Sequence, residues 1–83
     1  MSDFAHVTDG LVRRVLLREV GGDAIADAIT ITENAWQHDA TNEEVPFDVL
    51  DARDDALGEA LFYWNDEGDE HRTVEALRTF WSV

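Results

Sequence analysis

The stretch from Val45 to Trp64 repeats its large apolar residues with the period of an α-helix, and it is the longest helix that the sequence predicts. At 100° per residue these side chains fall within about 60° of one another and form a face wide enough to bury against a core. Pro46 suits the first turn, and Asn65 and Gly68 suit the end. The predicted buried face consists of Leu50, Leu57, Leu61 and Trp64.

The opposite face of this helix is acidic. Four carboxylates stack along it at helical spacing, and together they are called the acidic stripe: Asp48, Asp51, Asp55 and Glu59. No Lys interrupts the stripe, and Arg53 lies nearer the apolar side of the helix. Two interpretations stay open, a solvated helix face and a surface that binds a partner.

Three further amphipathic segments accompany the long helix, so the sequence predicts an all-α, compact, single-domain bundle of about four helices over residues 1–83. Gly21 and Gly22 suit the end of the first helix, and Asp23 and Asp69 suit the starts of two others. The run 29–32 is β-branched and also fits a short strand, although its context favours helix. The expected helices lie near residues 8–20, 23–38, 46–64 and 69–82.

The charge of the chain narrows the classes of partner. Nineteen acidic residues face six basic ones, all of them Arg, which gives a formal net charge of −13. Such a field repels nucleic acid and anionic membranes and attracts basic protein surfaces. Without Cys, an apolar span or an apolar N-terminal leader, the expected location is the cytoplasm.

No motif indicates an enzyme, a metal or a cofactor. The two serines, Ser2 and Ser82, lie near the chain ends, where a nucleophile is unexpected. The segment from Asn65 to Asp69 superficially resembles a calcium-binding loop but lacks the EF-hand order of ligands. We therefore expect a protein that is not an enzyme, without a catalytic residue, metal site or cofactor.

The aromatic residues divide into two groups. Phe62 and Tyr63 lie away from the leucine face, and consecutive aromatics followed by Trp64 cannot all point inward on one helix. An exposed aromatic beside acids is typical of a binding hot spot, whereas packing under a neighbouring segment is the alternative. The others are expected in the core: Phe4, Trp36, Phe47, Trp64, Phe80 and Trp81.

These features predict a non-enzymatic acidic module that binds a basic protein surface, in the sharper version an inhibitor that imitates nucleic acid, of the anti-restriction or anti-CRISPR type. The alternative is a salt-adapted small protein whose acidity serves solvation, in one version a dimeric helix-turn-helix-like regulator using Arg13, Arg14 and Arg18. A homodimer through Leu17 and Val20 is a further expectation. The predicted partner-binding residues are Asp48, Asp51, Asp55, Glu59, Phe62, Tyr63, Glu43 and Glu44.

Overall fold

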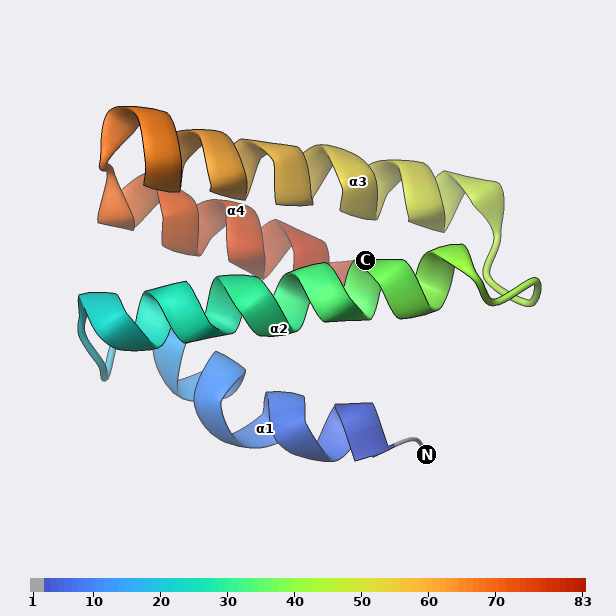
Figure 1. The fold of residues 1–83 in the computed structure, drawn as a ribbon, viewed down its shortest axis with the longest axis horizontal. Helices are drawn as coiled ribbons and strands as arrows, with labels where there is room; N and C mark the ends of the chain where they lie inside the picture. The colour runs from blue at the N-terminus through green and yellow to red at the C-terminus, as the bar shows by residue number, and fades with distance from the viewer. Residues whose placement is uncertain (1–2) are drawn as a thin grey trace.

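The computed structural model describes the backbone of residues 3–83 and the side chains of residues 10–83, so Phe4 lies outside the described side chains. Successive helices run antiparallel (Figure 1). The predicted all-α bundle of four helices is confirmed, and the run 29–32 is helical. The elements are α1 (Asp3–Leu16), α2 (Gly22–Ala40), α3 (Phe47–Phe62), a π-helical turn η1 (Tyr63–Glu67) and α4 (Glu70–Ser82).

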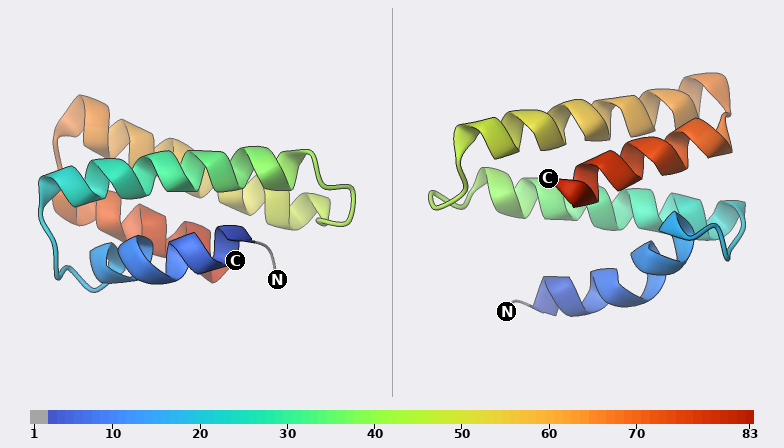
Figure 2. Two further views of the ribbon diagram at one scale, coloured as in Figure 1. Left: turned by 60° about the horizontal axis from the view of Figure 1, so that its bottom comes forward. Right: turned by 180° about the vertical axis from the view of Figure 1, so that it is seen from behind.

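The helices α2, α3 and α4 pack against one another, and α1 lies on the side of α2 that faces away from α3 (Figures 1 and 2). In the described part of the chain, α1 contacts α2 and α4 but not α3. Val12 and Val15 of α1 are buried in one apolar cluster with Ile25 and Ile29 of α2 and Leu77 of α4. The outer surface of α3 is therefore not covered by α1.

The helix predicted over residues 8–20 is wrong at both ends, because it spans Asp3–Leu16. The chain leaves the helix through Arg18, whose φ of 59° lies in the left-handed region, rather than through the glycine pair. Gly21 is instead the N-cap of α2, the position predicted for Asp23. A non-glycine residue in the left-handed region is strained by roughly 1–2 kcal/mol, so other contacts must hold this turn.

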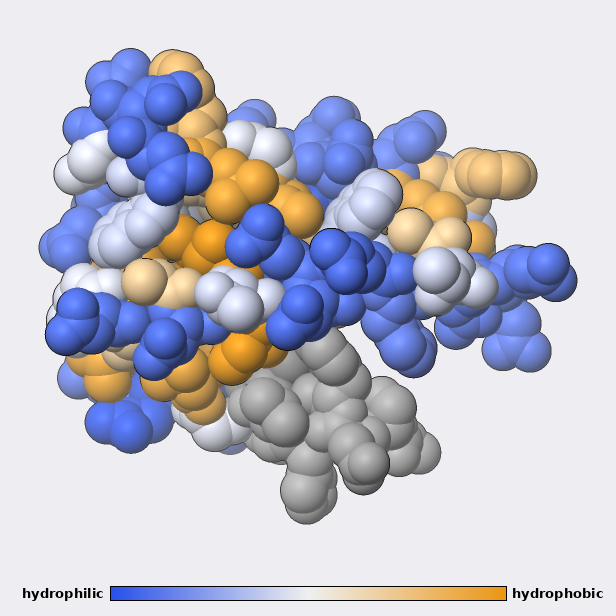
Figure 3. All heavy atoms as spheres, viewed as in Figure 1, coloured by the Kyte–Doolittle hydropathy of each residue, from blue (hydrophilic) through white to orange (hydrophobic). Residues whose placement is uncertain are grey.

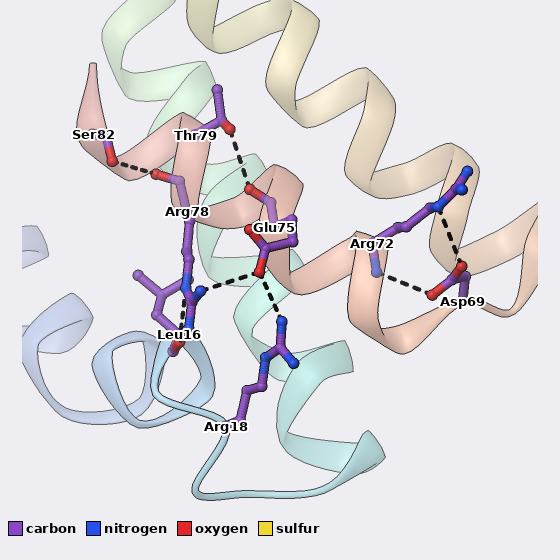
Figure 4. A network of polar contacts seen from close by, with 8 residues as sticks. All are labelled: Leu16, Arg18, Asp69, Arg72, Glu75, Arg78, Thr79 and Ser82. Atoms are coloured by element: carbon purple, nitrogen blue, oxygen red, sulfur yellow. Dashed lines mark hydrogen bonds and ion pairs between the residues drawn. The ribbon is translucent and has the colours of Figure 1, made fainter.

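Those contacts come from α4 (Figure 4). Arg78 donates two hydrogen bonds to the carbonyl oxygen of Leu16, one of them from Nε at 3.0 Å, and so satisfies an acceptor left open at the end of α1. Glu75 Oε1 accepts from Arg78 at 3.1 Å and from Arg18 at 2.7 Å. The end of α1 is thus fixed by residues far away in the sequence.

The buried face of α3 centres on small residues. Ala56 and Ala60 are 1% and 0% exposed. Of the four large residues in the predicted face only Leu57 is buried, and the others are partly exposed. Because alanine allows two helix axes to approach closely, α3 presents this side to α4. The prediction of the buried face was therefore only partly right.

The helix predicted over 46–64 ends earlier, and the chain continues through η1 to Gly68, which has a φ of 63°. The N–H of Asp69 donates to the carbonyl oxygen of Tyr63 at 2.9 Å, as in a glycine-terminated helix end. The side chain of Asp69 accepts from the N–H of Arg72 at 3.0 Å, which confirms the predicted cap. This short reversal sends α4 back along α3.

Candidate protein-binding surface

Arg53 is the single basic residue of α3, and it points toward the other helices. Its guanidinium forms an ion pair with Asp39 of α2 and donates to the backbone oxygen of Val83 at 2.9 Å. It also lies 5.5 Å from the centre of the Phe80 ring. The side chain is only 21% exposed. Arg53 therefore does not neutralise the acidic stripe on the outer side of its own helix.

All four side chains of the acidic stripe are exposed. Among the described side chains, the carboxylates that form ion pairs are those of Asp39, Asp69 and Glu75, and none belongs to the stripe. At 1.5 Å rise per residue the stripe extends over about 16 Å. It is a row of unpaired negative charge on a rigid element.

Glu43 and Glu44 precede the acidic stripe in the sequence and lie just before the start of α3. Both are exposed in the α2–α3 loop, close in sequence to Asp48. Asn42 fixes the loop, because its side-chain oxygen accepts from the N–H of Glu44 at 3.0 Å and its carbonyl accepts from the N–H of Val45 at 3.1 Å. The structure therefore places the predicted loop acids and the acidic stripe on continuous, ordered backbone.

Phe47 belongs to this end of the molecule, and its assignment to the core was wrong. It is 84% exposed and borders a hollow of about 380 Å³ whose lining includes Val45, Pro46 and Leu50. Apolar residues reach the surface at this end, which is on the right in Figure 3. The backbone of Val83 meets Arg53, so α3 extends past the end of α4 and its first turn has no α4 residue to cover it (Figure 1).

Phe62 and Tyr63 have different surroundings. Phe62 is 47% exposed, whereas Tyr63 is partly buried and its ring centre lies 5.5 Å from the guanidinium carbon of Arg72. Their rings meet edge to face at 5.5 Å. Phe62 lies about 22 Å along the helix from Phe47. The two exposed phenylalanines therefore lie at opposite ends of α3, and Tyr63 is only partly exposed.

The α1–α2 region lacks the basic second helix that a helix-turn-helix motif uses to bind nucleic acid. Arg13 and Arg14 are exposed on α1, but α2 contains neither Arg nor Lys, and its Asp23 and Asp27 are exposed. Of the two residues in the predicted dimer contact, Leu17 is 57% exposed. The other, Val20, packs against the core of its own chain.

Other kinds of site have little support in the described residues. They contain no cluster of three or more His, Cys, Asp or Glu side chains arranged to hold a metal ion, and no helix there is both long and apolar enough to cross a membrane. No protein-family model matches the chain, and no curated protein or solved structure is significantly similar to it. The exposed acidic stripe of α3 is the feature of the described residues that indicates a function.

Proposed function

We propose that this protein is a non-enzymatic binding module whose acidic α3 surface occupies a basic, nucleic-acid-binding surface of a partner protein. The observation that carries the proposal is the acidic stripe, which is exposed and unpaired because Arg53 is turned toward Asp39. Unpaired carboxylates on a rigid helix lose no internal partner when they meet Arg or Lys side chains, and they raise the association rate by electrostatic attraction.

The spacing of the stripe supports imitation of a nucleic acid strand. Four charges over about 16 Å give one charge per about 5 Å. One strand of B-DNA carries a phosphate every 3.4 Å or so along its axis. The stripe is sparser than a phosphate backbone but regular, and the exposed Glu43 and Glu44 precede it in the sequence. Inhibitors of restriction or CRISPR nucleases are the class of protein that this arrangement fits.

Charge reversal with a matched control tests the proposal. The stripe variant changes Asp48, Asp51, Asp55 and Glu59 to Lys. The control changes four exposed acids elsewhere to Lys, which gives the same net charge: Glu19, Asp27, Asp66 and Glu67. The probe is a fluorescent dodecapeptide of alternating Arg and Ala at low ionic strength, read by anisotropy. We expect the stripe variant to lose binding and the control to keep most of it, and equal loss in both would refute the proposal.

A salt-adapted protein is the second candidate function, because exposed acids also occur outside α3. Asp23 and Asp27 of α2 and Asp66 and Glu67 of η1 are all exposed. Screening at 1 M salt shortens the reach of charge repulsion to about 3 Å. Circular dichroism against salt separates the candidates, since a helical spectrum in dilute buffer supports the binding module and folding only in molar salt supports salt adaptation.

A further inference from the structure

The hollow beside Phe47 is lined by apolar residues together with Asn42, Glu43 and Glu44 of the α2–α3 loop. Ala40 at the end of α2, Val45, Pro46 and Leu50 contribute apolar surface to its volume of about 380 Å³. Leu50 N donates to the carbonyl oxygen of Pro46 at 3.1 Å, so the first turn of α3 is regular on that side of the hollow. A site that needs no rearrangement loses little conformational entropy on binding.

Phe47 does not serve the core. It belongs to neither cluster of buried residues, and with 84% of its surface exposed it forgoes most of the stabilisation that burial gives a Phe side chain. A large apolar residue at the lip of an apolar hollow is instead typical of a binding anchor, which is covered when a partner docks.

The charges around the hollow decide which partner fits. Glu43 and Glu44 line the hollow and are exposed, and the exposed Asp48 and Asp51 follow in the first two turns of α3. Arg53, the nearest base in the sequence, is held by Asp39 on another side of α3. A second copy of this chain, like a nucleic acid, would bring more negative charge to these acidic residues, whereas they would attract a basic segment.

We propose that the hollow receives an apolar side chain from a basic segment of the partner protein, with Phe47 packing on the stems of the flanking Arg or Lys side chains. This inference rests on the proposed function and specifies its partner as an Arg- or Lys-rich helix or strand that carries one large apolar residue. The acidic stripe gives attraction, and the hollow fixes the position of the segment along α3.

Two peptides and two variants test the inference. The probes are the alternating Arg–Ala dodecapeptide and the same peptide with one central Ala replaced by Leu. The larger side chain should raise affinity about five- to tenfold if the hollow buries it. Phe47 lines the hollow and also packs on the arginine stems of both peptides, so Phe47→Ser should weaken both peptides and should reduce the gain from Leu below about twofold. Phe62→Ser, the matched control at the other end of α3, should keep the gain.

The outcomes separate the two proposals. If the Leu peptide binds no tighter than the Ala peptide, or if both Ser variants lose the gain equally, the hollow is not the anchor site and the inference is overturned. The proposed function fails separately if neither peptide distinguishes the stripe variant from its control. Sedimentation of the parent and of Phe47→Ser tests whether a second copy of the chain occupies the hollow. If the parent is a dimer that Phe47→Ser dissociates, the hollow binds a second copy and the inference is overturned.

Discussion

Replacing Arg53 by Met tests whether this arginine stabilises the packing of the helices, as the proposal of an unneutralised acidic stripe requires. Arg53 pairs with Asp39, donates to Val83 at 2.9 Å and lies over the ring of Phe80. Methionine keeps much of the apolar volume of the side chain but provides no donor and no charge. The substitution therefore removes the ion pair with α2 and the hydrogen bond to Val83, and it leaves the carboxylate of Asp39 without its guanidinium partner.

The expected loss of stability is about 2–3 kcal/mol. Removing one partner of a fully buried ion pair costs about 3–5 kcal/mol, because the other charge stays desolvated, whereas an exposed pair is worth about 0–1 kcal/mol. The side chains of Arg53 and Asp39 are 21% and 15% exposed, which places this pair between the two limits and nearer the buried one. For a domain of this size such a loss lowers the melting temperature by on the order of 10–20 °C.

Urea unfolding followed by circular dichroism at constant salt measures this loss. The control is the double variant Arg53→Met with Asp39→Asn, which removes the stranded carboxylate as well. It should regain at least about 1 kcal/mol relative to Arg53→Met alone, because a neutral amide is less costly to leave without a charged partner. The reasoning is refuted if Arg53→Met unfolds at the same urea concentration as the parent, or if the two substitutions simply add.

Four other substitutions have expected outcomes. Gly58→Ala should raise the free energy of unfolding by about 0.5–1 kcal/mol, because Gly58 lies inside a helix and a Cβ there meets nothing within 4 Å. Gly68→Ala should lower the free energy of unfolding by about 1–2 kcal/mol, because its φ is 63°. Denaturant unfolding of the two variants measures both changes. Arg78→Lys should free the end of α1, visible as faster amide hydrogen exchange in residues 11–16 with α3 unchanged, since lysine cannot donate from two nitrogens to one carbonyl. Asp55→Lys should stabilise the chain in dilute buffer by about 1 kcal/mol and weaken binding of the arginine peptide, measured by unfolding and anisotropy.

The helices themselves were predictable because each carries local information. The period of the apolar residues located all four, and Asp69 identified the start of α4 through a cap that depends on neighbouring atoms alone. The end of α1 was not predictable in this way. Arg18 takes the left-handed conformation beside a carbonyl that Arg78 satisfies, and that contact depends on the packing of α4 rather than on the residues between α1 and α2.

The candidate site was partly predictable for the same reason. The exposure of the acidic stripe follows from helical periodicity, and the structure bears it out. The position of Phe47 depends on the relative lengths of two helices, since α4 ends near Arg53 and leaves the first turn of α3 without cover. In the sequence, Pro46 indicates that Phe47 lies in the first turn of the helix, next to the loop acids. The angle of Phe47 around the helix does not show whether another helix reaches far enough to cover that turn.

The acidic stripe works against the helix that carries it. Asp48 with Asp51, Asp51 with Asp55, and Asp55 with Glu59 are like-charge neighbours at i, i+3 or i, i+4, and together they cost roughly 1 kcal/mol at low salt. The one arginine of α3 could offset part of this repulsion on the outer face, but it is held by Asp39 instead. Screening ions or a basic partner would relieve this repulsion from outside the chain. A stripe that needs ions alone would gain nothing from an exposed Phe47 and a preformed hollow at its end, and these two features favour the partner.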